Sequence, residues 1–233
     1  MRSTGRKRAG QEASARGNER SENMRIGIYG GSFNPVHNGH IHLAGTAIEE
    51  LGLYRLYLIP SRISPHKSSA EYVSPEDRLA MLRLACKGSR YRDVLRVSDY
   101  ELMTDRVSYT IYTVEEFRRR FPKEELVLLI GSDMLLSFDK WHRYEDILRE
   151  VTIAAFSREN GDLEELEKKA EELRRFGRVI LSKADPVVVS STEIRKKIAK
   201  NENYSCYLDK NVVQYIRSGN LYSGENADKG AED

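Results

Sequence analysis

An apolar segment runs directly into a glycine-rich turn in the stretch IGIYGGSFNPVHNGH, residues 26–40. A strand that leads into such a turn and then into a helix is typical of phosphate-binding sites. Glycines let backbone amides approach oxygens, and the start of a helix attracts anions. Two histidines, His37 and His40, stand at the end of the turn. The stretch therefore predicts a βα unit that binds a phosphorylated ligand.

The spacing of the two histidines predicts that they lie together. If the helix begins near Val36, His37 and His40 are three residues apart and share one face. Apolar residues continue that face toward the core, so we expect the histidines to face the sheet. These apolar positions are Ile41, Ala44, Ile48 and Leu51. The alternative is a pair of exposed histidines in a polar loop.

The composition is that of a soluble α/β protein with one large domain or two small ones. The chain has 233 residues, of which 39% are hydrophobic and 32% charged. It contains no apolar run of the length that a membrane-spanning helix needs. Cys86 and Cys206 lie far apart without metal-ligand spacing, which favours neither a disulfide framework nor a zinc site on sulfur. We expect a cytoplasmic protein with no membrane partner.

The net charge of +2 is unevenly distributed along the chain. Residues 1–23 carry six basic and three acidic side chains, and without this surplus of three the remainder has a formal charge of about −1. The body therefore lacks the basic surface of a nucleic-acid-binding protein. We expect residues 1–23 to form a disordered basic tail, with Met24 as a candidate start, and residues 223–233 to form a second disordered tail.

Strand and helix patterns alternate through the rest of the chain, which predicts a doubly wound parallel sheet of α/β class. Strands are expected at 26–29, 55–60, 94–97, 126–130, 151–156 and 178–181. Helices are expected to about 51, from 75, and at 109–120, 163–176, 191–200 and 209–218. The last two form a small C-terminal helical portion, and a single domain is expected to span residues 24–222.

Four polar clusters follow apolar runs, at 30–40, 60–67, 131–133 and from 190 onward. Ligands of such sheets bind outside the carboxyl ends of the strands, near the point where the strand order switches. We therefore expect the four clusters to meet at one edge of the sheet and to form a single site.

The cluster at 190–195 is expected to form a second phosphate site. Ser190 and Glu193 have the spacing of a capping box, and Arg195 follows one turn into the helix. Opposite the glycine-rich turn, these hydroxyls, amides and the guanidinium would suit a polyphosphate. The alternative is a capped surface helix with a solvated arginine.

Three further side chains have both a functional and a structural interpretation. Asp133 could accept hydrogen bonds from ribose hydroxyls or help to hold a metal ion, or it could cap a turn. Trp141, the only tryptophan, could stack on a flat heterocycle or seal a loop. Lys67 could offer a mobile cation to an anionic substrate or could be a surface lysine.

The chain also lacks two common catalytic motifs. It has no GxxxxGK[ST] run, which argues against a P-loop ATPase. It has no serine or cysteine in a nucleophile elbow, so covalent catalysis has no candidate.

These motifs carry a resemblance to a known family. Residues 30–40 together with 190–195 resemble the nucleotidyltransferase superfamily of histidine-x-glycine-histidine enzymes. With SPHK at 64–67, SYT at 108–110, GSD at 131–133 and Trp141, residues 24–222 are similar to the bacterial nicotinate-mononucleotide adenylyltransferases. Asn34 stands where the family commonly has aspartate and Ser64 where proline is common, so neither is given a catalytic role. The motifs do not explain the charged helical segment at 162–176.

The resemblance implies a Rossmann-like fold and transfer of an adenylyl group from ATP to nicotinate mononucleotide, which gives nicotinate adenine dinucleotide and pyrophosphate. It implies Mg²⁺ held mainly by phosphates with no protein ligand, no nucleic-acid partner, and a monomer or homodimer. The catalytic residues would be His37, His40 and Arg195. ATP would be bound by Gly30, Ser32, Phe33, Gly131, Asp133, Ser190 and Ser191. The acceptor would be bound by Lys67, Thr110 and Trp141.

Other functions stay open from the sequence. The same fold could act on the amide mononucleotide, on phosphopantetheine, or on a small phosphate with CTP. A class I aminoacyl-tRNA synthetase uses similar histidines, but the chain leaves no room for a tRNA-binding domain. His37, His40 and Asp133 could instead form the metal site of a phosphohydrolase. An RNA-binding module led by the basic tail is disfavoured by the near-neutral body.

Overall fold

A parallel sheet forms the centre of the molecule, with the strand order β3-β2-β1-β4-β5-β6. The computed structural model describes residues 24–62, 73–104, 107–157, 163–182, 184 and 188–223. The strands are β1 (Arg25–Gly31), β2 (Arg55–Pro60), β3 (Leu95–Val97), β4 (Glu125–Gly131), β5 (Thr152–Phe156) and β6 (Val179–Leu181). Each neighbouring pair is parallel, which confirms the predicted doubly wound architecture. The predictions for residues 1–23, Lys67 and residues 224–233 lie outside the described residues.

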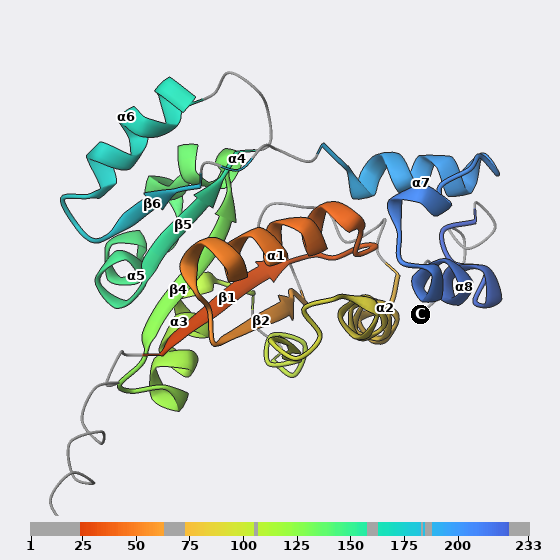
Figure 1. Ribbon diagram of the computed structural model, residues 1–233, viewed down its shortest axis with the longest axis horizontal. Helices are drawn as coiled ribbons and strands as arrows, with labels where there is room; N and C mark the ends of the chain where they lie inside the picture. Colours follow the sequence, from red (N-terminus) through yellow and green to blue (C-terminus); the bar gives the residue numbers. More distant parts are fainter. Residues whose placement is uncertain are drawn as a thin grey trace, which may run out of the picture.

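Helices cover both faces of this sheet (Figure 1). They are α1 (Asn38–Leu51), α2 (Pro75–Gly88), α3 (Thr110–Arg120), α4 (Ser132–Leu136), α5 (Tyr144–Glu150), α6 (Leu163–Leu173), α7 (Ser191–Ala199) and α8 (Lys210–Ser218). Short 3₁₀ turns lie at η2 (Phe138–Lys140) and η3 (Ser205–Tyr207). Helices α1, α2, α3, α6, α7 and α8 fall close to the predicted ones, because each predicted segment combined apolar residues at helical spacing with a recognisable start or stop. The short helices α4 and α5 were not predicted.

The central strands are apolar on both faces because each face carries its own core. In β4, Val127 and Leu129 belong to the core under α1, α2, α7 and α8, whereas Leu126 and Leu128 belong to the core under α3, α5 and α6. Successive side chains of a strand point to opposite faces, so this alternation is what a doubly covered sheet requires. The uninterrupted apolar pattern of this strand was therefore a correct signal of burial on both sides.

Helix α6 accounts for the charged segment that the motifs left unexplained. It ends at Leu173, three residues earlier than predicted, and buries Leu166, Ala170 and Leu173. It packs against α4 and β6, where Figure 1 shows it at the outer edge of the sheet. Its charged residues lie on the other face, as expected for an amphipathic helix that seals an edge strand.

The C-terminal helices α7 and α8 lie together at the right of Figure 1, where α8 is next to α2. Helix α8 packs against α2, and the Tyr215 hydroxyl donates a hydrogen bond to Asp77 at 2.9 Å. Val188 and Val189, which precede the polar cluster at 190, are not part of the sheet: Val188 is 78% exposed, and both residues lie in irregular structure. The polar cluster at 190 therefore approaches the site from an adjoining segment and does not follow a strand, contrary to expectation. Within the described part of the chain, no helix is long and apolar enough to cross a membrane.

Candidate active site

A cavity of about 370 Å³ opens at the carboxyl ends of β1 and β4. These two strands are neighbours in the sheet although two other strands separate them in sequence, so the cavity marks the switch in strand order. Six of the predicted site residues line it: Gly30, Ser32, His40, Thr110, Asp133 and Trp141. The expectation that separate polar clusters meet at one edge of the sheet is confirmed for three of the four clusters. Gly30, Ser32 and His40 represent the cluster at 30–40, Ser61 that at 60–67 and Asp133 that at 131–133.

The two histidines meet at the start of α1, but in a different way from the predicted one. Helix α1 begins at Asn38, and His37 is its N-cap with an extended backbone. The backbone N–H of His40 donates to Nδ1 of His37 at 3.3 Å, and the N–H of His37 donates to Nδ1 of His40 at 3.2 Å. The two rings stack with centroids 3.6 Å apart. The pair therefore forms a reciprocal cap and does not share a helical face.

This cap determines which nitrogen of each ring is available to a ligand. A neutral imidazole whose Nδ1 accepts a hydrogen bond carries its proton on Nε2. Both histidines are thus set to donate through Nε2. His40 lines the cavity, whereas His37 is 7% exposed and does not line it. Neutral donors at a helix start, where backbone dipoles already attract anions, suit phosphate oxygens.

Two glycines of the opening stretch, Gly39 and Gly30, have different surroundings. A Cβ on Gly39 would lie 3.1 Å from Nδ1 of His37 and 3.3 Å from Cβ of Val189. A side chain there would push apart the histidine cap and the segment that leads into α7. At Gly30 a Cβ would meet nothing within 4 Å, because this residue faces the cavity. Gly39 is therefore needed for close packing, whereas Gly30 leaves the wall of the cavity open.

The start of α7 packs directly on the turn before α1. The Ser191 hydroxyl donates to the backbone carbonyl of Pro35 at 2.9 Å, and the Arg195 guanidinium donates to the carbonyl of Asn34 at 3.0 Å. Two helix starts are thus brought together, as expected for a polyphosphate site. The predicted capping box is wrong: Ser190 makes no side-chain cap, and Glu193 pairs with Lys196 at 2.9 Å. The nearby lysine offers this exposed carboxylate a charged partner.

Asn34 lies where the turn before α1 meets the start of α7 and the C-terminal segment. Nothing in the sequence indicated this role. It is fully buried, and its Oδ1 accepts from the Tyr222 hydroxyl at 2.8 Å and from the Val73 N–H at 3.4 Å. Burial raises the pKa of Tyr222 above its usual range. The C-terminal segment therefore holds the phosphate turn through a neutral hydrogen bond.

Arg78 is a second buried residue that supports the site. It is 1% exposed, and its guanidinium donates to the carbonyl of Ser32 at 2.9 Å and to the carbonyl of Ser61 at 2.7 Å. These carbonyls follow β1 and β2, so Arg78 joins the ends of two strands at the cavity. A signal existed in the sequence, because Arg78 shares the buried face of α2 with Met81, Leu82 and Ala85.

Four predicted ATP-binding residues do not line the cavity, namely Phe33, Gly131, Ser190 and Ser191, and neither do His37 and Arg195 of the predicted catalytic residues. The Phe33 ring is fully buried, packs edge-on against Tyr29 with centroids 5.5 Å apart, and belongs to the core. Gly131 is buried as the N-cap of α4, the helix that presents Asp133. Any contact of Phe33 with phosphate would therefore use its backbone.

The opposite wall of the cavity comes from α3 and the loop before α5. Thr110 is the first residue of α3, and Trp141 follows η2 with its ring centroid 4.8 Å from that of Phe138. The His142 ring lies against Tyr109 with centroids 4.7 Å apart. His142 was not predicted because it has no distinctive spacing, and Tyr109 lies in the SYT motif but was given no role of its own. This wall combines flat rings with the start of a helix.

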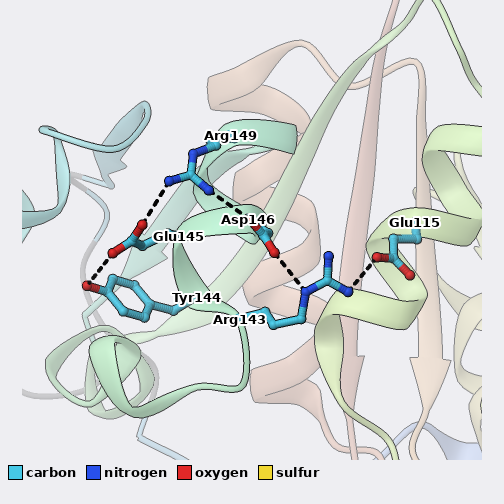
Figure 2. Close-up of polar contacts among 6 residues, drawn as sticks. All are labelled: Glu115, Arg143, Tyr144, Glu145, Asp146 and Arg149. Carbon is cyan, nitrogen blue, oxygen red and sulfur yellow. Dashed lines mark hydrogen bonds and ion pairs between the residues drawn. The ribbon is translucent and has the colours of Figure 1, made fainter.

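Ion pairs fix the loop of Trp141 to α3 (Figure 2). Arg143 has a left-handed backbone with φ of 55°, and its guanidinium contacts Glu115 of α3 at 2.8 Å and Asp146 of α5 at 2.7 Å. These carboxylates raise the pKa of Arg143, which stays charged. Arg149 binds Asp146 from the other side at 2.7 Å. The network therefore orients the loop that lines the cavity.

The metal-site alternative does not fit the arrangement of these residues. Among the residues that the structure describes, no group of three histidine, cysteine, aspartate or glutamate side chains is close enough to hold a metal ion. His37, His40 and Asp133 therefore do not form the site of a metal-dependent phosphohydrolase. The two histidine Nδ1 atoms are engaged instead with backbone amides.

The fold is shared with solved structures of nucleotide enzymes. The structure of Plasmodium falciparum nicotinic acid mononucleotide adenylyltransferase complexed with NaAD matches with a TM-score of 0.71 at 21% sequence identity, over 85% of this chain and 97% of that one. The same enzyme complexed with APC matches with a TM-score of 0.70 at 20% identity. At this level of identity the likeness shows the fold alone.

Sequence comparison gives the family. Residues 28–197 match the model of the cytidylyltransferase-like family. Two curated proteins carry the name "Probable nicotinate-nucleotide adenylyltransferase". The one from Carboxydothermus hydrogenoformans is 38% identical, over 85% of this chain and 98% of that protein. The one from Idiomarina loihiensis is 34% identical, over 84% of this chain and 98% of that protein. The chain therefore belongs to the cytidylyltransferase-like family and, within it, to the nicotinate-nucleotide adenylyltransferases.

Proposed function

We propose that this chain transfers the adenylyl group of ATP to nicotinate mononucleotide, which yields nicotinate adenine dinucleotide and pyrophosphate. The observation that carries the proposal is the reciprocal histidine cap at the edge of a cavity formed by β1 and β4, with a second helix start packed against it. Two adjoining helix starts suit the several phosphates of ATP. The curated relatives support the choice of reaction.

ATP binds with its phosphates at the starts of α1 and α7. His37 and His40 donate to phosphate oxygens and stabilise the charge that develops in the transition state. Arg195, Ser190 and Ser191 hold the β and γ phosphates. Backbone groups of Gly30, Ser32 and Phe33 line the phosphate path, and Gly131 with Asp133 holds the adenosine. The exposed carboxylate of Asp133 within the cavity supports that last role.

Nicotinate mononucleotide binds against the wall formed by α3 and the Trp141 loop. The Trp141 ring stacks on the nicotinate ring, while Thr110 at the start of α3 contacts it. Lys67, which lies outside the described residues, contacts the acceptor's phosphate. A flat apolar ring beside a helix start suits an acceptor that is both aromatic and anionic.

The transfer is a single displacement. An oxygen of the acceptor's 5′-phosphate attacks the α-phosphorus of ATP, and the bond to the oxygen that bridges the α and β phosphorus breaks. Pyrophosphate leaves with that oxygen. The protein contributes positioning and charge stabilisation, because the substrate itself supplies the nucleophile.

Mg²⁺ fits this chemistry as a partner of the phosphates. The described cavity wall offers oxygen donors in Asp133 and Ser32, the type of ligand that Mg²⁺ prefers, but no cluster of three candidate ligands. The ion would therefore be held mainly by phosphate oxygens and would neutralise their charge.

Both cysteines are free, in agreement with a protein that works in the reducing cytoplasm.

A pyrophosphate-release assay over a panel of acceptors tests this proposal. With ATP and Mg²⁺, nicotinate mononucleotide is expected to be turned over with a kcat/KM at least tenfold above that for nicotinamide mononucleotide or phosphopantetheine. CTP in place of ATP serves as the donor control. A preference for phosphopantetheine, or release of phosphate in place of pyrophosphate, would contradict the proposal.

A further inference from the structure

Glu101 is a buried carboxylate in the cavity wall that the proposed transfer does not use. It is 7% exposed and comes from the loop after β3. It lines the cavity together with Ser108 and Thr113, on the same side as Thr110. Acidic side chains are rarely buried without a specific partner, so its position calls for an explanation.

Hydrogen bonds make Glu101 the meeting point of three segments. The Thr113 hydroxyl on α3 donates to Oε1 of Glu101 at 2.6 Å, and the Ser108 side chain also bonds to this carboxylate. Oγ of Ser108 in turn accepts from the backbone N–H of Arg62 at 3.2 Å. The Arg62 guanidinium donates to the carbonyl of Leu102 at 3.1 Å. The loops after β2 and β3 are thus joined to the start of α3.

The electrostatic surroundings make this arrangement costly. Desolvation raises the pKa of Glu101, and the hydroxyls of Thr113 and Ser108 offset part of that effect. Among the described residues no cation forms an ion pair with Glu101. The other titratable residues that line the same cavity are His40, Tyr109, Asp133, Lys140 and His142. Burial of this carboxylate costs desolvation free energy, so a contribution to stability is a poor explanation for it. A better explanation is that its two acceptor oxygens hold neighbouring segments in place.

We propose that Glu101 is a positioning residue for the acceptor half of the active site. By fixing Ser108 and Thr113, it sets the position of the segment between them, which contains the first turn of α3 and Thr110. Thr110 and Trp141 line the same cavity, so the position of α3 affects where the acceptor's ring can bind. This inference rests on the proposed function, because it assigns Thr110 and Trp141 to the acceptor.

The test uses substitutions that remove one part of this arrangement at a time. Glu101→Ala removes both acceptor oxygens, and Thr113→Val removes one donor with almost no change of shape. Thr113→Ser keeps that donor. Asp99→Ala is the matched control, because Asp99 lies in the same loop but is exposed. Binding is measured by titrating nicotinate mononucleotide against the fluorescence of Trp141, the only tryptophan of the chain. The KM values for both substrates come from pyrophosphate release.

We expect Glu101→Ala and Thr113→Val to weaken acceptor binding about tenfold, as measured by Kd and KM, while the KM for ATP changes less than twofold. Thr113→Ser is expected to recover most of the binding that Thr113→Val loses, and Asp99→Ala to match wild type. If Glu101→Ala fails to fold, the Thr113 pair decides the question.

Three results would overturn the inference. Acceptor binding by Thr113→Val at the wild-type Kd would remove the proposed role, as would an equal rise in both KM values. Failure of Thr113→Ser to recover binding would point to packing in place of the hydrogen bond. The proposed function fails separately, and the inference with it, if the wild-type protein neither binds nor turns over nicotinate mononucleotide.

Discussion

His40 combines two tasks that use different nitrogens of its ring. Nδ1 accepts from the backbone N–H of His37 and so caps α1, while Nε2 carries the proton that we propose is donated to a ligand. Capping contributes about 1 kcal/mol to helix stability, whereas a donor placed at developing charge contributes a hundredfold or more to rate. The two tasks can therefore be separated by substitution.

His40→Ala is expected to lower kcat at least about 100-fold and the free energy of unfolding by about 1 kcal/mol. His40→Asn keeps an acceptor near the position of Nδ1, so it is expected to lose the same rate with less loss of stability. Pyrophosphate release and urea denaturation measure the two effects. His42→Ala, an exposed position on the same helix, is the control. Near-normal kcat in His40→Ala would remove this residue from the mechanism.

Tyr222 stabilises the phosphate turn from the far end of the described chain. Tyr222→Phe removes the hydroxyl that donates to buried Asn34, so we expect the free energy of unfolding to fall by about 1–2 kcal/mol. Urea denaturation at neutral pH measures this change. Tyr54→Phe, at a side chain that is 49% exposed, is expected to have no measurable effect. Equal stabilities of the two variants would show that the Asn34 contact contributes nothing.

Helices α3 and α5 are linked by Arg143, which lies in the loop directly before α5 and near the cavity. Arg143 occupies a left-handed backbone conformation that costs a non-glycine residue about 1–2 kcal/mol. Its ion pairs with Glu115 and Asp146 hold it there (Figure 2). Such strain near a cavity is expected to be retained where it orients a functional loop.

Substitution of Arg143 separates backbone strain from ion pairing. Arg143→Gly and Arg143→Ala both lose the guanidinium, but only alanine keeps the strain. We therefore expect the glycine variant to melt about 3–6 °C higher than the alanine variant. Thermal unfolding followed by circular dichroism gives both melting temperatures. If the alanine variant melts at the same temperature as the glycine variant, the left-handed backbone at this position does not carry the expected strain.

For the whole molecule, the two cysteines report on how well the core excludes solvent. Burial raises the pKa of the Cys86 thiol to about 12, whereas Cys206 is exposed. Since the thiolate is the reactive form, Cys86 is expected to be inert at pH 8. A colorimetric disulfide reagent should therefore titrate one thiol per folded chain and two after denaturation. Two fast-reacting thiols in the native protein would contradict the core described here.

The fold could be predicted from the sequence because its signals are local. The apolar run of β4, the Ser74-Pro75 start of α2 and the glycine after α8 each specify an element within a few residues. The site was predicted in part for the same reason, since Gly30, His40 and Asp133 directly follow strands or lie near them.

The rest depends on contacts between residues far apart in the chain. The Tyr222 bond to Asn34 spans 188 residues and the Arg195 bond to the same residue spans 161. The partners of buried Glu101 and Arg78 are likewise set by the folded structure. The prediction of a capping box at Ser190 was wrong because Glu193 forms an ion pair with Lys196. The spacing of the residues does not show which of the two contacts Glu193 makes.

In the proposed reaction the acceptor's phosphate attacks ATP directly at a site that stabilises charge. The most direct test uses ATP carrying a chiral phosphorothioate at the α-phosphorus, with nicotinate mononucleotide as acceptor. A single in-line displacement predicts a thio-substituted nicotinate adenine dinucleotide with inverted configuration at phosphorus. Retention of configuration would contradict the account, because it requires a covalent adenylyl-protein intermediate and a second displacement.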